Sequence, residues 1–167
     1  VDKKLYKEDI KGSIAHVEIL FKQKIISLKI KNKIIYGLNK IEREISTKKF
    51  EFNKKYEDIH MNIEKRLFQI IGEDAGYIHT ARSRNDQVIT DFKIWIKSAT
   101  KEINLELEKV IKSTLKIAEK NIQTIMPGFT HLKNAQAISF AHYLMSYVEI
   151  FNRDKKRFSN NLESLDE

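Results

Sequence analysis

Apolar residues recur along the first half of this chain at intervals of three and four, which is the spacing of a helix that buries one face. The pattern predicts a first helix over Ile14–Lys22 with Ser13 as its N-cap, and a second that opens at Ser27. A third predicted helix carries Ile59, Ile63, Leu67 and Ile70 and ends at Gly72. Because only five Gly and one Pro interrupt the chain, we expect an all-α protein.

The second half of the chain predicts two much longer helices. No Pro or Gly lies between Asp86 and Gln123, and at roughly 1.5 Å per residue such a helix would extend on the order of 55 Å. A second apolar stripe runs from Phe140 to Leu165 after a turn at Pro127-Gly128. Two antiparallel helices form half a bundle, so we expect their partners in downstream sequence, in other subunits, or in both.

The predicted organisation is a small N-terminal helical domain over residues 1–82, followed by the first part of a helical-bundle domain over residues 83–167. The chain opens at Val1 rather than at Met and closes within a helical pattern. We therefore expect a fragment of a longer protein, with the bundle domain truncated.

Composition narrows the classes of protein that fit. Hydrophobic residues make up 41% and charged residues 32%, which is typical of a globular protein. The absence of Cys excludes disulfides, and the chain has no apolar run long enough to span a membrane, so we predict a cytoplasmic protein with no membrane partner. Lys and Arg exceed Asp and Glu by 8, which favours anionic partners, either nucleic acid or small carboxylates.

The segment from His79 to Gln87 is crowded with hydrogen-bond donors and directly precedes the long helix. Free backbone N–H groups at a helix N-terminus attract anions, and Ser83, Arg84 and Asn85 add donors suited to a carboxylate. The same residues also fit a plain polar loop in which Asn85 or Asp86 caps the helix, and this alternative stays open.

A second irregular segment, from Pro127 to His131, follows the long helix. His131 could move a proton near neutral pH, and Thr130 could donate to a carboxylate. A lone histidine in a loop is more often structural than catalytic, so these two residues do not by themselves predict an activity.

Several motifs occur together in one order. They are Asp9-Ile10-Lys11-Gly12-Ser13-Ile14-Ala15-His16, Glu57-Asp58-Ile59-His60, His79-Thr80-Ala81-Arg82-Ser83-Arg84-Asn85-Asp86-Gln87, and Pro127-Gly128-Phe129-Thr130-His131. In this order and spacing the chain resembles the argininosuccinate lyase family over nearly its whole length. The resemblance implies a fumarase/aspartase-type helical bundle that assembles as a homotetramer with composite active sites, and reversible β-elimination of argininosuccinate to arginine and fumarate in arginine biosynthesis, without a cofactor or metal.

The resemblance also implies roles for single residues. His131 matches the catalytic histidine, which either transfers the proton or orients another group that does so. The predicted substrate-binding residues are Asp58, His60, Ser83, Arg84, Asn85 and Thr130. A serine in a mobile Gly-Ser-Ser-x-Met-Pro loop, the family's second catalytic residue, has no counterpart in this sequence, so we predict that the chain alone is inactive.

Four positions depart from the family pattern. Ala81 replaces a usual glycine, and its methyl group would be costly if the backbone there has positive φ. Lys133 and Ala137 replace Gln and Pro, and Phe129 replaces Tyr. Because Arg84, Asn85, Thr130 and His131 remain, these changes do not predict loss of activity.

Two other functions remain as alternatives. One is a non-catalytic structural relative with the same fold, against which the intact Thr130-His131 pair argues. The other is a basic helical module that binds nucleic acid, but no basic run with interleaved aromatics supports it. We therefore predict small-molecule substrates and no nucleic-acid partner.

Overall fold

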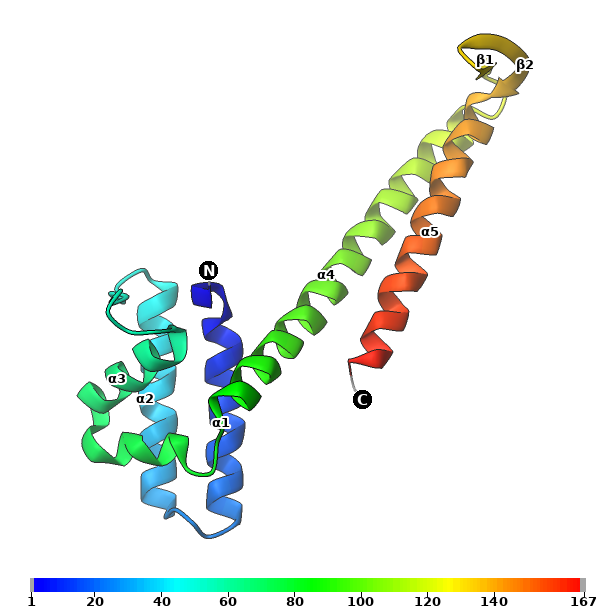
Figure 1. The fold of residues 1–167 in the computed structure, drawn as a ribbon. Coiled ribbons are helices and arrows are strands. Elements are labelled where there is room, and N and C mark those ends of the chain that lie inside the picture. Colours follow the sequence, from blue (N-terminus) through cyan, green and yellow to red (C-terminus); the bar gives the residue numbers. More distant parts are fainter. Residues whose placement is uncertain (1, 166–167) are drawn as a thin grey trace. The chain divides into compact units, whose positions relative to one another are not determined.

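The computed structural model describes residues 2–165, which are almost entirely helical (Figure 1). The elements in chain order are a 3₁₀ helix η1 (Asp2–Leu5), α1 (Tyr6–Lys22), α2 (Leu28–Ser46), α3 (Ile59–Ile71), a second 3₁₀ helix η2 (Gly72–His79), α4 (Arg84–Lys120), β1 (Ile125–Thr130), β2 (Lys133–Ser139) and α5 (Phe140–Ser164). The predicted all-α class is confirmed, with one β-hairpin added to it. The chain forms two compact units, Val1–Trp95 and Ile96–Glu167, and α4 contributes residues to both.

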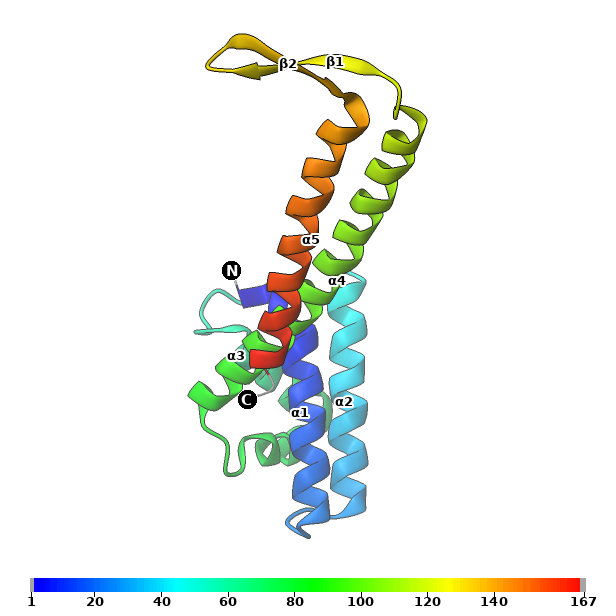
Figure 2. The same cartoon turned by 90° about the vertical axis from the view of Figure 1, so that its right-hand side faces the viewer.

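The first unit buries its core between α1, α2 and α3, and Figure 2 shows α1 and α2 side by side. The predicted apolar stripes supply this core, which includes the fully buried side chains of Val17, Ile34, Leu38, Ile63 and Leu67. Burial of such a side chain stabilises the fold by about 1.5–3 kcal/mol. Gly37 lets α2 approach α3 closely, because a Cβ at this position would collide with Cδ1 of Leu67.

Capping side chains determine where α2 and α3 begin, and a glycine determines where α3 ends. Ser27 is the N-cap of α2, as predicted, and its Oγ accepts from the backbone N–H of Ile30 at 3.3 Å. Asp58 is the N-cap of α3, and its Oδ1 accepts from the N–H of Met61 at 2.6 Å. Gly72 ends α3 with a φ of 73°, which a glycine adopts without steric cost.

The predicted start of the first helix is wrong, because α1 begins at Tyr6 and Ser13 lies inside it. Ser13 is buried and its Oγ accepts a hydrogen bond from Nη1 of Arg82 at 2.8 Å. At the neighbouring Gly12 a Cβ would lie 3.1 Å from Oδ1 of Asp91. These small residues serve close packing against α4 and the turn that precedes it, not a helix cap.

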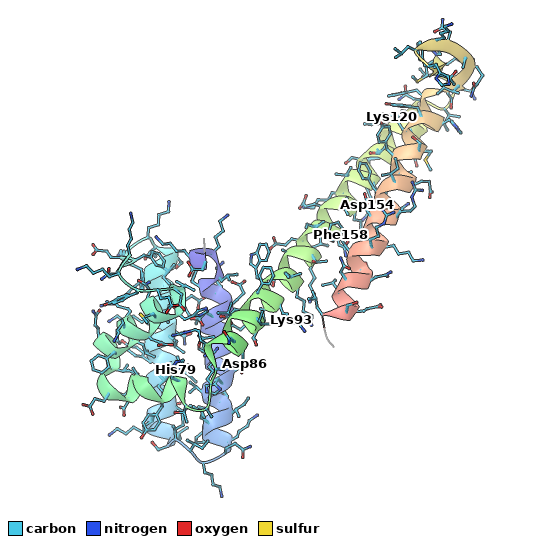
Figure 3. The ribbon with its side chains drawn as sticks, in the orientation of Figure 1. His79, Asp86, Lys93, Lys120, Asp154 and Phe158 are labelled. Carbon is cyan, nitrogen blue, oxygen red and sulfur yellow. The ribbon has the colours of Figure 1, made fainter. Side chains whose placement is uncertain are left out.

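The second unit consists of the later part of α4, the hairpin and α5, with Lys120 at the end of α4 and Asp154 and Phe158 on α5 (Figure 3). Two polar contacts join the helices: Nδ2 of Asn104 donates to Oγ of Ser159 at 3.3 Å, and Nζ of Lys155 lies 3.3 Å from Oε2 of Glu108. The two long helices are confirmed, although α4 begins at Arg84 and ends at Lys120.

Much of the apolar surface of this unit stays exposed among the residues that the structure describes. Ile103, Val110 and Ile117, which recur along α4 at an interval of seven residues and so share one face, are 40–48% exposed. A helix with an uncovered apolar face gains little from packing, so this exposure agrees with the expectation that the stripes lack their full set of partners.

The predicted turn at Pro127-Gly128 is instead part of a β-hairpin. Strands β1 and β2 pair antiparallel, with an irregularity in the register between Pro127 and Phe129. Gly128 sits at this bulge, where a Cβ would lie 2.8 Å from the backbone oxygen of Gln136. The sequence predicted no strand here because Pro and Gly both argue against one, and the apolar alternation of a strand is missing.

The domain boundary predicted after residue 82 stays a prediction. Its two ranges include residues 1, 166 and 167, which lie outside the described part of the chain.

Candidate functional site

The predicted site residues fall in both units. Asp58 and His60 lie at the start of α3, and Ser83, Arg84 and Asn85 lie at the start of α4, all in the first unit. Thr130 and His131 lie at the hairpin of the second unit and are described separately below.

Arg84 is held by groups from α3 and by its own helix. Its Nε lies 3.5 Å from Oδ2 of Asp58, and its Nη1 lies 3.0 Å from Oε1 of Glu64. Nη1 also donates to Oε1 of Gln87 at 3.0 Å. The structure therefore brings together the predicted pair Asp58 and Arg84. Sequence reasoning missed Glu64, which could have been found because it lies one helical turn after His60.

A buried cluster of titratable residues is linked to Arg84 through Gln87. Nδ1 of His60 is 2.8 Å from Oδ1 of Asp9 and 3.6 Å from Oδ2 of Asp91. All three side chains are at most 3% exposed. The sequence did not predict a role for Asp9 or Asp91, because nothing in it indicates that helices α1, α3 and α4 pack against one another at these residues.

One donor atom from each of Asp9, His60 and Asp91 lies within 4.8 Å of the others, so the cluster has the residue types of a metal site. Nδ1 of His60 and Oδ1 of Asp9 are already hydrogen-bonded to each other, and the guanidinium of Arg82 supplies positive charge near the carboxyl groups. Both oxygens of Asp91 are buried, and neither has a hydrogen-bond partner among residues 2–165. We interpret the cluster as a buried group of side chains in which the carboxyl of Asp91 retains its proton.

The charges in this cluster shift the ionisation of its members. Burial alone would raise the pKa of Asp9, but the hydrogen bond and the charge of His60 lower it below the ordinary value. Burial would lower the pKa of His60, but the hydrogen bond and charge of Asp9 raise it. Burial and the neighbouring charge of Asp9 raise the pKa of Asp91 to about 7. Asp9 and His60 therefore form an ion pair, while Asp91 keeps its proton up to near-neutral pH.

The donor-rich turn before α4 is fastened to α1 at two points. Nε2 of His16 lies 2.9 Å from the backbone oxygen of Thr80, and Arg82 donates to Ser13 as described above. Between these contacts Ala81 has a φ of 52°, in the left-handed region. The turn is therefore held in a fixed conformation even though Ala81 is a costly residue for it.

Helix α4 begins directly at the end of this turn. Its first backbone bond runs from the N–H of Gln87 to the oxygen of Ser83 at 3.1 Å, and Asp86 lies in its first turn (Figure 3). The alternative in which Asn85 or Asp86 caps the helix is wrong, because α4 already includes both. Ser83 and Asn85 are exposed, so their side chains and the free N–H groups of the helix end are open to an anion.

In the second unit, Thr130 and His131 lie at the tip of the hairpin. Thr130 pairs with Lys133, so that His131 and Leu132 form a two-residue turn. Both turn residues have positive φ, 49° and 64°, as in a type I′ turn. The side chain of His131 is exposed and that of Leu132 is 99% exposed, so the structure presents this pair on a strained turn.

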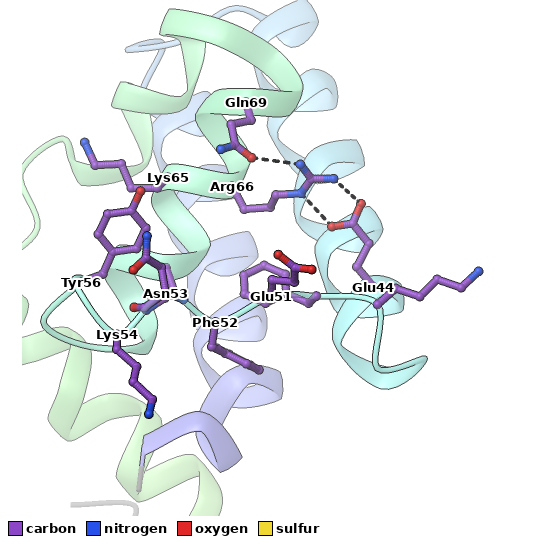
Figure 4. Close-up of a pocket in the computed structure, with 12 residues that line it drawn as sticks. Glu44, Glu51, Phe52, Asn53, Lys54, Tyr56, Lys65, Arg66 and Gln69 are labelled. Carbon is purple, nitrogen blue, oxygen red and sulfur yellow. Dashed lines mark hydrogen bonds and ion pairs between the residues drawn. The ribbon is translucent and has the colours of Figure 1, made fainter.

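One hollow in the first unit is a separate feature. It has a volume of about 530 Å³ and lies between the segment after α2 and helix α3 (Figure 4). Its guanidinium, Arg66, already makes two hydrogen bonds of 2.8 Å to Glu44 and one of 2.9 Å to Gln69. None of the predicted site residues lines it, and its central cation is neutralised. A second hollow of about 370 Å³ touches Gly12, Arg82 and Gln87 beside the donor-rich turn.

No helix within residues 2–165 combines the length and the apolar character needed to cross a membrane.

Comparison with known proteins identifies a matching family and close relatives of this chain. The model of a protein family described as "Lyase" matches residues 1–166. An argininosuccinate lyase from Pelagibacter ubique (strain HTCC1062) is 81% identical over 167 residues, which are all of this chain and 36% of that protein. An argininosuccinate lyase from Chelativorans sp. (strain BNC1) is 51% identical over 166 residues, 99% of this chain and 35% of that protein. The chain thus spans about a third of the length of these relatives.

Solved structures share the fold. An EDDS lyase variant with bound fumarate has a TM-score of 0.84 and 23% identity, over 96% of this chain and 31% of that one. A fumarate lyase:delta crystallin from Brucella melitensis has a TM-score of 0.83 and 13% identity, over 98% of this chain and 42% of that one. These likenesses confirm the expected fold, an N-terminal helical part followed by long bundle helices.

Proposed function

This chain belongs to the lyase family whose model spans residues 1–166, and we propose that it forms the N-terminal third of an argininosuccinate lyase. The complete enzyme would cleave argininosuccinate reversibly to arginine and fumarate by β-elimination. One observation carries the proposal furthest: Arg84 is held beside Asp58 at the exposed N-terminus of α4, within the Ser83-Arg84-Asn85-Asp86-Gln87 motif.

The chemistry of this end of α4 suits the substrate. Argininosuccinate carries a succinyl group with two carboxylates, and Arg84 can bind one of them with paired hydrogen bonds. Ser83, Asn85 and the free backbone N–H groups offer further donors. Removal of a proton from the carbon next to a carboxylate transfers charge onto that carboxylate, and donors already in place stabilise the charge as it develops.

Thr130 and His131 complete the proposed machinery from the second unit. Thr130 would donate to a substrate carboxylate, and His131 would either move the proton or orient the group that does so. We further propose that the enzyme is a cytoplasmic homotetramer with composite active sites, in which the Arg84 turn and the His131 turn of one chain serve different sites. His60 would support the site from beneath through Asp9, and its direct contact with substrate stays a prediction.

A chimera tests the proposal with the sequence in hand. Residues 1–167 replace the matching third of the Pelagibacter ubique argininosuccinate lyase, to which they are 81% identical. Fumarate formation from argininosuccinate is followed by ultraviolet absorbance. We expect turnover by the chimera, together with a loss of at least about 100-fold in kcat for His131→Asn, in the range seen for general acid–base groups.

The His131→Asn variant removes the imidazole without disturbing the hairpin, because Asn tolerates the positive φ of residue 131. A folded, tetrameric chimera that forms no fumarate would contradict the proposed activity and favour a non-catalytic relative. Full activity of His131→Asn would instead remove His131 from the chemistry.

A further inference from the structure

Gln87 connects the buried acid cluster of the first unit to the guanidinium of Arg84. It lies in α4 three residues after Arg84 and is 3% exposed, although its side chain is polar. Its Oε1 accepts from Nη1 of Arg84 at 3.0 Å, and its Nε2 donates to Oδ1 of Asp9. Both ends of one buried amide are therefore occupied, one by a cation and the other by an anion.

We propose that Gln87 is a positioning residue, which fixes the guanidinium of Arg84 for an anionic substrate and is itself fixed by Asp9. This inference rests on the proposed function, because it assigns Arg84 the substrate carboxylate. The inference adds Gln87 to the site as a residue that does not contact the substrate and acts only through Arg84.

The orientation of the Gln87 amide follows from its two neighbours. Asp9 is an acceptor that already takes a hydrogen bond from Nδ1 of His60 at 2.8 Å, so it can receive only the amide NH₂. The oxygen of the amide must then face Arg84. The opposite orientation would place two donors against each other at Arg84 and two acceptors against each other at Asp9, and both polar contacts of the buried amide would be lost.

An amide suits this position better than a carboxylate would. Arg84 already faces two acidic groups on α3, those of Asp58 and Glu64. A third anion would neutralise the guanidinium further and weaken its attraction for a substrate carboxylate. Gln87 accepts a hydrogen bond without adding charge, so it restricts the guanidinium while leaving its positive charge in place.

Kinetics of the chimera described above test the inference. Gln87→Leu removes both hydrogen bonds, and we expect KM for argininosuccinate to rise about ten-fold while kcat stays within about two-fold, because uniform binding of a carboxylate is lost. Gln87→Glu keeps the size and the acceptor but adds charge, and we expect its KM to rise at least as far. This variant remains informative if Gln87→Leu fails to fold.

Gln69 provides a matched control. It accepts from Nη1 of Arg66 at 2.9 Å with the same three-residue spacing on a helix, but it lies outside the proposed site. Gln69→Leu should leave KM within about two-fold of the unsubstituted chimera.

A double variant separates positioning from a general structural role. If Gln87 acts through Arg84, adding Gln87→Leu to Arg84→Gln should raise KM no further than Arg84→Gln alone. A KM within about two-fold of the unsubstituted value in both Gln87 variants, or an equal rise of KM in the Arg84→Gln background, would overturn the inference alone. An unsubstituted chimera without turnover would overturn the proposed function and the inference together.

Discussion

Nη1 of Arg82 donates to Oγ of Ser13 at 2.8 Å, across 69 residues of sequence. The bond joins the turn before α4 to the middle of α1. Ser13 is 1% exposed and Arg82 is half-buried, so without this hydroxyl the Arg82 donor would lose an acceptor on its buried side. The position of the turn, and with it the start of α4, therefore depends on a side chain that looks like an ordinary helix residue.

We expect Ser13→Ala to lower the free energy of unfolding by about 1 kcal/mol, since it leaves a partly buried charged donor without this acceptor. Urea denaturation of the 167-residue chain measures the change. Ser46→Ala is the control, because Ser46 is exposed and its hydroxyl donates to the backbone oxygen of Arg43 in the same helix. Equal losses for the two variants would show that the Arg82 contact contributes no stability.

Ala81→Gly should raise the free energy of unfolding by about 1 kcal/mol. Ala81 has a φ of 52°, a conformation that costs an L-residue about 1–2 kcal/mol and a glycine almost nothing. Ala15→Gly gives the opposite sign, a loss of about 1 kcal/mol, because Ala15 is an exposed residue within α1. A loss of stability in Ala81→Gly would mean that the methyl group makes contacts that outweigh the strain.

Ionisation of Asp91 should lower the free energy of unfolding of the first unit as the pH rises. The pKa of Asp91 is raised from 3.8 to about 7, mainly by burial, so the folded state holds a proton that the unfolded state releases within this range. Stability therefore falls as the pH rises from about 4 to about 7, and the full cost is present above about 7.

Asp91→Asn should flatten this dependence. The free energy of unfolding of the variant, measured in urea at a series of pH values, will show a smaller decrease as the pH rises. Part of the decrease should remain, because the raised pKa of His60 also lowers stability with rising pH. Asp154→Asn on α5 is the control and should keep the slope of the unsubstituted chain. The account of Asp91 is wrong if Asp91→Asn and Asp154→Asn give the same pH profile.

Leu132→Gly should stabilise the hairpin by about 1 kcal/mol. Leu132 has a φ of 64° and is 99% exposed, so the change relieves strain and removes no contact among the residues that the structure describes. Thermal unfolding followed by circular dichroism measures it. Leu105→Gly, at a 60% exposed position within α4, should have the opposite effect.

The fold was predictable wherever the signal was local. The stripes of Ile34, Leu38, Ile63 and Leu67 repeat within single helices, and burial follows their spacing. The hairpin was missed because Pro127 and Gly128 both argue against a strand, and because its turn residues, His131 and Leu132, carry none of the Asn-Gly chemistry that favours positive φ.

The candidate site was predictable only where its residues belong to recognisable motifs. Arg84 and Asp58 belong to motifs that the sequence displays, and the structure places them 3.5 Å apart. Asp9, Gln87 and Asp91 lay within or close to the same motifs, but a role for them depends on burial, which arises only when α1, α3 and α4 pack together. No spacing within one helix contains that information.

The two acidic side chains that contact Arg84 weaken the attraction of its guanidinium for a single anion. They contact Nε and Nη1, so an incoming carboxylate shares the positive charge with Asp58 and Glu64 and gains less than it would from an arginine without acidic neighbours. A small monovalent anion makes a single contact with this partly neutralised cation and gains little. A ligand with two carboxylates can engage Arg84 and the helix end at once, which makes this corner of the molecule selective for dicarboxylates over the chloride, acetate and similar ions that surround it.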